Sequence, residues 1–245
     1  MKNIKLQVEY DGTDFCGWQK QLNGRTVQGE IERALEKVLK KPVKLSGSGR
    51  TDAGVHALGQ VANFNEDISV PTDKIPYALN SLLPADIAIW KAEEVEANFH
   101  ARYSAKRKKY IYQIYNDKVR SPLMRNYAFF VPQPLDYDAM CAAGKYFLGT
   151  HDFKGFMAAG SNVKDTIRTL YKLDVYLSND LIKIEVEGNG FLYNMVRIIA
   201  GTLIEVGKGN ILRTAIPQII DSGMRDKAGP TAPAQGLYLA EVFYV

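Results

Sequence analysis

Strand-like and helix-like segments alternate along this chain, in nearly the same order in its two halves. In the first half, residues 4–10 alternate apolar and polar side chains, as a strand with one buried face does. Residues 27–39 place apolar side chains at helical spacing, and Thr26 precedes them as the expected N-cap. The other elements expected in this half are two short strands, a helix and a strand, at 43–45, 60–64, 72–82 and 87–95.

The second half has a similar pattern. Two strands there are expected to form a hairpin, because turn-forming residues separate two apolar runs. The expected elements are strands at 109–115, 169–177, 181–187 and 237–245, helices at 137–148, 192–206 and 211–221, and a hairpin turn at Ser178, Asn179 and Asp180. Each half therefore has roughly the order β-α-β-β-α-β, with a second helix before the last strand of the second half. This order predicts an α+β fold of two ferredoxin-like halves, 1–105 and 106–245, with mainly antiparallel sheets that join and a central active-site cleft.

The glycine-rich segment 46–59, SGSGRTDAGVHALG, is the first candidate for chemistry. Glycines allow backbone conformations that side chains forbid, and they let a ligand approach closely. The segment lacks the Gly-Lys-Ser/Thr of a phosphate-binding loop, and Ser46 stands where a Gly-x-Ser-x-Gly elbow needs glycine. The residues leave two interpretations open for Asp52. It is a functional carboxylate on an exposed loop, or it is a local cap in a turn that connects two strands.

Residues 191–204, FLYNMVRIIAGTLI, form the second candidate. Apolar residues surround this predicted helix, which indicates burial, and Arg197 is its only charged residue. A buried guanidinium needs an acidic partner, because an unpaired buried charge is costly. Asp52 is a good candidate for that partner. The alternatives are a purely structural ion pair, or a position for Arg197 at the edge of the helix.

Basic and aromatic residues follow one another in segment 102–115, RYSAKRKKYIYQIY. Basic side chains contact phosphates, and aromatic rings stack on exposed bases. The segment contains Arg102, Lys106, Arg107, Lys108 and Lys109, followed by Tyr110, Tyr112 and Tyr115. Residues 1–105 hold 13 Lys+Arg and 14 Asp+Glu, whereas residues 106–245 hold 18 and 13. This excess suits a polyanionic partner. The alternative is a set of solvated lysines beside tyrosines that pack into a sheet.

Several classes of protein are excluded or disfavoured by what the sequence lacks. No Gly-x-Gly-x-x-Gly follows a strand, so we expect no dinucleotide cofactor. The three histidines and two cysteines lack the spacing of metal ligands, so we expect no metal. The alternating N-terminal segment is unlike a signal peptide, and no run is apolar enough to span a bilayer. We therefore expect a cytoplasmic protein with no membrane partner.

Taken together, these segments resemble the tRNA pseudouridine synthase A (TruA) family over nearly the whole chain. The matching segments are YDGTDFCGWQ at 10–19, TVQGEIERAL at 26–35, GRTDAGVHAL at 49–58, FHARYSA at 99–105, GTHDF at 149–153, FLYNMVRIIAGTLIEVG at 191–207 and AGPTAPAQGLYL at 228–239. The chain departs mildly from the family at Tyr193, Asn194 and Ile198, but not at Arg197.

The resemblance implies the pseudouridine synthase fold and assigns roles to four residues. Asp52 corresponds to the catalytic aspartate and Arg50 to the loop arginine linked to base flipping. Tyr110 corresponds to the tyrosine that stacks on the target uracil, and Arg197 to the arginine that pairs with the aspartate. The implied substrate is uridine at tRNA positions 38, 39 and 40, in the anticodon stem-loop. The implied enzyme is a homodimer without cofactor or metal.

Two other functions remain compatible with the residues alone. A non-catalytic RNA-binding module would explain the basic and aromatic residues but would leave Asp52 without a role. A small-molecule acyl- or glycosyl-transferring enzyme would use the glycine-rich loop but would leave the run from Lys106 to Lys109 unexplained.

Overall fold

The computed structural model describes residues 1–161, 163–178 and 180–245, which form two compact units. Unit 1 contains Met1–Lys106 and Tyr238–Val245, and unit 2 contains Arg107–Leu237. The predicted α+β class is confirmed, since each unit combines helices with a mainly antiparallel sheet. Within the described residues, no helix combines the length and the apolar character needed to span a membrane.

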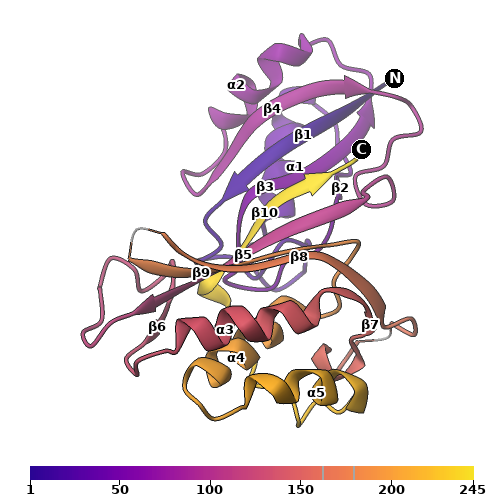
Figure 1. Ribbon diagram of the computed structural model, residues 1–245. Helices are drawn as coiled ribbons and strands as arrows, with labels where there is room; N and C mark the ends of the chain where they lie inside the picture. The colour runs from indigo at the N-terminus through magenta and orange to yellow at the C-terminus, as the bar shows by residue number, and fades with distance from the viewer. Residues whose placement is uncertain (162, 179) are drawn as a thin grey trace. The chain divides into compact units, whose positions relative to one another are not determined.

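Unit 1 has the predicted β-α-β-β-α-β order. Its elements are β1 (Lys2–Tyr10), α1 (Val27–Leu39), β2 (Ser46–Gly47), β3 (His56–Glu66), η1 (Thr72–Lys74), α2 (Ile75–Asn80), β4 (Ile87–Val95) and the C-terminal β10 (Leu237–Phe243). Strand β1 is antiparallel to both β3 and β4, and β10 is parallel to β3. Figure 1 shows α1 behind β1 and β3 in that view.

Strand β10 lies with the first unit, although the predicted division grouped it with the second half. Tyr238 and Leu239 pair with His56 and Ala57 of β3. The backbone N–H of Lys106 donates to Phe243 O at 2.8 Å. The periodicity of the sequence indicates a strand here, but it does not indicate which neighbouring strand satisfies the backbone hydrogen bonds.

Unit 2 carries its helices together on one side of β8 and β9 (Figure 1). Its elements are β5 (Arg107–Asn116), β6 (Phe129–Val131), α3 (Tyr137–Gly144), η2 (Lys145–Phe147), β7 (Gly149–Asp152), η3 (Lys154–Phe156), β8 (Ile167–Ser178), β9 (Leu181–Gly188), α4 (Met195–Gly207), η4 (Arg213–Ala215), α5 (Ile216–Ser222) and η5 (Ala234–Gly236). Strand β9 is antiparallel to both β5 and β8, which confirms the predicted hairpin. Asn179 of its predicted turn lies outside the described residues.

Several predicted elements differ from the structure, among them the helices predicted at 72–82 and 137–148, each of which is divided between an α-helix and a 3₁₀-helix. Residues 43–45 form no strand, because Leu45 N donates to Glu32 Oε1 and Leu45 O accepts from Gln28 Nε2, both on α1. The first strand of this region is β2, two residues long. The helix predicted at 192–206 begins at Met195, and the helix predicted at 211–221 is divided into η4 and α5.

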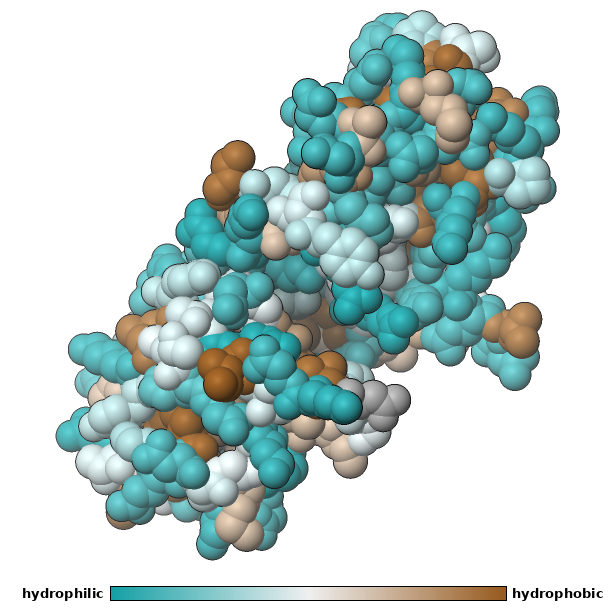
Figure 2. Space-filling model, turned by 90° about the vertical axis from the view of Figure 1, so that its right-hand side faces the viewer, coloured by the Kyte–Doolittle hydropathy of each residue, from teal (hydrophilic) through white to brown (hydrophobic). Residues whose placement is uncertain are grey.

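The hydrophobic core of each unit is formed by its own alternating and helical apolar positions. In unit 1, Ile4, Leu6 and Phe64 of the sheet are buried with Ile31 and Leu35 of α1. In unit 2 the buried core contains the aromatic residues Tyr112, Phe147, Phe153 and Phe156. Figure 2 shows hydrophilic residues over most of the face in view, with apolar residues in small separate patches. Burial of the apolar side chains is the main force that holds each unit together.

Candidate active site

The glycine-rich loop lies in unit 1, between β2 and β3, and ends in a tight turn. Asp52 is half-buried, whereas Arg50 is exposed. Val55 N donates to Asp52 O at 3.2 Å, and Gly54 adopts a φ of 77°, which favours glycine. The turn therefore fixes the backbone on the C-terminal side of Asp52.

The N-terminal motif at 10–19 packs against the other side of Asp52. Trp18 N donates to Thr51 O at 3.1 Å, and the Tyr10 hydroxyl shares a buried 2.7 Å hydrogen bond with Thr51 Oγ1. Burial raises the pKa of the Tyr10 phenol, so this hydroxyl stays neutral. Gly17 approaches so closely that a Cβ there would lie 2.6 Å from Thr51 O. The N-terminal motif thus packs against the loop at Thr51 and restricts the position of its backbone.

Strand β3 holds the start of the loop through hydrogen bonds. Ser48 Oγ donates to Gln60 Oε1 at 2.6 Å, and Gln60 Nε2 donates to Gly49 O at 3.1 Å. Ser48 N also donates to Val61 O at 2.7 Å. Both ends of the loop are consequently fixed, and Arg50 and Asp52 are displayed on a rigid support. Sequence patterns did not indicate the part played by Tyr10 or Gln60.

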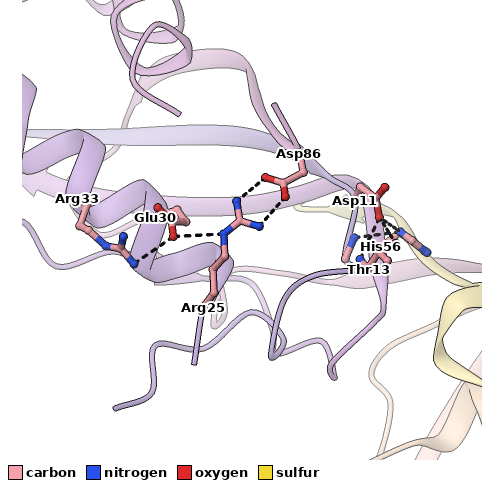
Figure 3. Close-up of polar contacts among 8 residues, drawn as sticks. Asp11, Thr13, Arg25, Glu30, Arg33, His56 and Asp86 are labelled. Atoms are coloured by element: carbon pink, nitrogen blue, oxygen red, sulfur yellow. Dashed lines mark hydrogen bonds and ion pairs between the residues drawn. The ribbon is translucent and has the colours of Figure 1, made fainter. Parts of the chain in front are cut away.

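His56, the histidine within the loop motif, is a structural residue. Its Nδ1 accepts a hydrogen bond from Gly12 N at 3.0 Å, so this nitrogen carries no proton. The 3.2 Å approach of the same nitrogen to Asp11 Oδ1 is therefore not an ion pair of a charged imidazole. The Asp11 carboxylate accepts from Thr13 N and Thr13 Oγ1 (Figure 3). The ring also stacks on Tyr238 at 4.7 Å between centroids.

A cluster of charged residues fixes the segment between β1 and α1. Arg25 Nη1 and Nη2 donate to the two carboxylate oxygens of Asp86 at 2.6 and 2.9 Å, and Glu30 lies 3.5 Å from Arg25 Nε (Figure 3). The Arg25 guanidinium also lies over the Phe15 ring, 4.2 Å from its centroid. Such a bidentate pair fixes geometry as well as charge. The sequence gives a signal for Arg25 only through its place before the motif at 26–35.

Tyr110 lies on β5 of unit 2, paired with Val186 of β9. Its ring is buried and meets the Phe191 ring edge to face, with centroids 5.0 Å apart. Tyr112, on the same face of the strand, donates its hydroxyl to Pro233 O at 2.8 Å. Phe191 therefore fixes the orientation of the Tyr110 ring.

Arg197 is half-buried on α4, a helix whose other residues are almost all buried. Its Nε donates to Ala232 O at 2.7 Å, and its Nη1 donates to Asn194 Oδ1 at 2.8 Å. The predicted burial of helix α4 is confirmed, but the Arg197 side chain is only half-buried. The pairing of Arg197 with Asp52 stays a prediction.

The basic residues at 102–109 occupy different settings. Arg102 and Lys106, in unit 1, are exposed, and the Arg102 guanidinium lies over the Tyr103 ring at 5.7 Å. In unit 2, Arg107 forms a 2.5 Å ion pair with Glu187 across β5 and β9. Lys108 and Lys109 are half-buried on the same strand. Exposure alone thus favours Arg102 and Lys106 as phosphate contacts.

Comparison with known proteins decides the family. The profile described as tRNA pseudouridine synthase matches residues 6–104 and 143–245. The chain belongs to the tRNA pseudouridine synthase family. The tRNA pseudouridine synthase A of Acetivibrio thermocellus is 52% identical over 244 residues, and that of Caldicellulosiruptor bescii is 54% identical over 244. Each comparison covers 100% of both chains, so the similarity to tRNA pseudouridine synthases includes every segment of the candidate site.

Solved structures offer a more distant comparison. A chain of the crystal structure of a Cbf5-Nop10-Gar1 complex aligns with a TM-score of 0.36 and 11% identity, over 82% of this chain and 54% of that one. So low a score adds nothing to the family assignment, which depends on the sequence similarity.

Proposed function

We propose that this protein converts uridine to pseudouridine in tRNA, with Asp52 as its catalytic carboxylate. Membership of the tRNA pseudouridine synthase family supports the reaction, and full-length relatives about half identical to the chain support tRNA as the substrate. The single structural observation that supports Asp52 is the loop itself. It is fixed by Thr51, Val55 and the Ser48–Gln60 pair, so it offers one carboxylate on a rigid backbone.

The reaction explains why a carboxylate is enough. The bond between ribose C1′ and uracil N1 breaks, the base turns, and C5 bonds to C1′, while the C5 proton leaves and N1 gains one. Nothing is oxidised or reduced, and no group is gained. Asp52 acts either as a nucleophile on the sugar or as the base that removes a ribose proton to give a glycal-like intermediate. Both roles need the ionised carboxylate, which pairing with Arg197 would favour.

The target base must leave its stack before it can react, at a cost of a few kcal/mol that contacts in the pocket offset. We assign Arg50 to the space that the base vacates, because it is exposed on the same loop as Asp52. We assign Tyr110 to the face of the uracil, because Phe191 holds its ring edge to face. Arg102, Lys106, Arg107, Lys108 and Lys109 are the proposed phosphate contacts, and Arg107 is already neutralised in part by Glu187.

The proposed targets are uridines 38, 39 and 40 of the anticodon stem-loop, and the proposed active form is a homodimer in the cytoplasm. Both cysteines of the chain are free thiols, which agrees with a reducing compartment. Sedimentation at micromolar concentration would test the dimer. A monomer that remains fully active would rule it out as the active form.

Release of tritium from tRNA labelled at uridine C5 tests the catalytic assignment. We expect release by the wild type, and a fall of more than about a hundredfold in Asp52→Asn and Asp52→Ala, because a single group performs the bond exchange. Affinity for tRNA should change little in both variants, and it should fall with salt as phosphate contacts require. Substantial turnover by Asp52→Asn would exclude Asp52 as the catalytic carboxylate. A wild type that binds tRNA without release would indicate an RNA-binding module instead.

The same assay locates the target. Transcripts that keep one labelled uridine at position 38, 39 or 40, with cytidine at the other two, should each release tritium. A transcript with cytidine at all three positions should release none. Release from that last transcript would place the modified uridine elsewhere in the tRNA.

A further inference from the structure

The residue that precedes helix α4, Asn194, does not perform the usual task of its position. It is the N-cap, and asparagine is among the best N-capping residues. Here its side chain makes no capping hydrogen bond, and its backbone adopts a left-handed φ of 60°. Asparagine tolerates this conformation better than most residues. The side chain instead accepts from Arg197 Nη1 at 2.8 Å.

A second acceptor holds the Arg197 guanidinium at a different nitrogen. Nε donates to Ala232 O at 2.7 Å, and the backbone bond from Ala232 N to Arg197 O, at 3.1 Å, returns from the same residue. A guanidinium is planar and rigid, so bonds at both Nε and Nη1 together restrict the orientation of its plane. Asn194 and Ala232 together therefore set where Arg197 points.

The Ala232 anchor is itself held tightly. Gly229 N donates to Thr202 Oγ1 of α4 at 2.9 Å, and the Tyr112 hydroxyl donates to Pro233 O at 2.8 Å. Gly201 of α4 lies so close that a Cβ there would be 1.8 Å from Pro230 O. The Ala232 carbonyl is thus part of a rigid segment. Asn194, by contrast, holds Arg197 through a side chain, so a substitution can remove this anchor.

We propose that Asn194 is a positioning residue for the isomerisation, acting only through Arg197. The proposal rests on the proposed function, in which Arg197 pairs with the catalytic carboxylate. Without the Asn194 acceptor, the guanidinium keeps its bond to Ala232 O but is no longer held at Nη1 by this side chain. The catalytic carboxylate then meets a less well-oriented partner, while the surfaces that bind tRNA are unchanged.

Substitution by glycine isolates this effect, because glycine adopts a φ of 60° without strain. For Asn194→Gly we expect kcat to fall about tenfold, as for the loss of one charge-assisted hydrogen bond, with KM for tRNA and the melting temperature nearly unchanged. Asn194→Asp should restore kcat to near the wild-type value, because a carboxylate accepts the same bond and aspartate also tolerates this backbone. In an Arg197→Ala background, Asn194→Gly should cause no further loss.

Asn210→Gly provides the matched control, since Asn210 donates its Nδ2 to Glu205 Oε2 at the other end of α4. It should leave kcat unchanged. A wild-type kcat in Asn194→Gly, or an equal additional loss in the Arg197→Ala background, would overturn the proposal. A lower melting temperature with unchanged kcat would make Asn194 a structural residue only. If the wild type itself releases no tritium from tRNA, the proposed function fails instead.

Discussion

At the scale of single residues, Gly17 is the position where the N-terminal motif most clearly controls the candidate catalytic loop. We predict that Gly17→Ala lowers the free energy of unfolding by about 3 kcal/mol, because it combines a left-handed backbone with a steric clash. The φ of Gly17 is 93°, and a Cβ would lie 2.6 Å from Thr51 O. Activity should fall further than stability accounts for, because the loop must shift beside Asp52.

Gly209→Ala separates the two causes in the Gly17 prediction. Gly209 also has a left-handed φ, of 78°, but nothing lies within 4 Å of its Cβ position. Its substitution should cost only the conformational term, about 1 kcal/mol, and should leave kcat unchanged. Chemical denaturation with both variants measures the difference. Equal losses for Gly17→Ala and Gly209→Ala would show that the clash is relieved without cost.

The candidate catalytic residues could be proposed from the sequence, but the residues that hold them in position could not. A carboxylate on a glycine-rich loop and one arginine in an apolar helix are unusual enough to be noticed. Gln60 and Asn194 are ordinary polar residues, and their roles come from partners 12 and 3 residues away. No periodicity encodes such side-chain hydrogen bonds, because they depend on how the backbone has already folded.

At the scale of elements, Gly201 within α4 reverses the usual effect of a helical glycine. Replacing glycine by alanine inside a helix normally stabilises it by about 1 kcal/mol. We predict that Gly201→Ala instead destabilises unit 2 by about 3 kcal/mol or more, because the Cβ would be 1.8 Å from Pro230 O. That segment carries the Ala232 carbonyl which anchors Arg197, so the turnover number should fall as well.

Gly207→Ala, at the end of the same helix, is the matched control for Gly201. Its Cβ would meet Met140 Sδ at 2.8 Å, and a flexible thioether can move away where a backbone carbonyl cannot. The cost should therefore be well below that of Gly201→Ala, with activity retained. Thermal unfolding of the two variants measures this. A stabilised Gly201→Ala would mean that the 229–236 segment moves freely on the helix.

Elements were predictable where one local signal dominates. Helix α1 has both its bounds as predicted, and Thr26 Oγ1 accepts from Gly29 N at 3.3 Å as the expected N-cap. Residues 43–45 have a strand-like composition, yet α1 side chains take their backbone hydrogen bonds. Helix α4 begins three residues later than predicted, because Asn194 adopts a left-handed conformation. Tertiary hydrogen bonds decided the first case, and a local left-handed backbone decided the second.

At the scale of the whole molecule, the order of the chain and the composition of unit 1 do not coincide. The unit is formed by the first 106 residues together with the last eight, Tyr238–Val245. The sequence shows a final strand but not its partner, since any strand with suitable apolar residues fits several sheet edges. Its membership in unit 1 depends on tertiary contacts, among them the pairing of β10 with β3.

This arrangement predicts that unit 1 depends on the end of the chain. A protein that stops at Leu237 loses the stacking of Tyr238 on His56, at 4.7 Å, and the 2.8 Å bond from Tyr244 Oη to Ala101 O. It also loses the burial of Leu239 and Val242. We expect the free energy of unfolding of unit 1 to fall by about 5 kcal/mol, which is comparable to the whole stability of a small domain.

Hydrogen exchange resolved by segment tests this dependence within one molecule. In the shortened protein, amides of β3 should exchange far faster, whereas those of the β8–β9 hairpin in unit 2 should keep their protection, because their hydrogen bonds lie within unit 2. Tritium release should be lost with β3, since the loop that carries Asp52 leads into that strand. Removal of Val245 alone, which is fully exposed, should change neither measurement. Normal protection of β3 in the protein that stops at Leu237 would mean that unit 1 folds without its last strand.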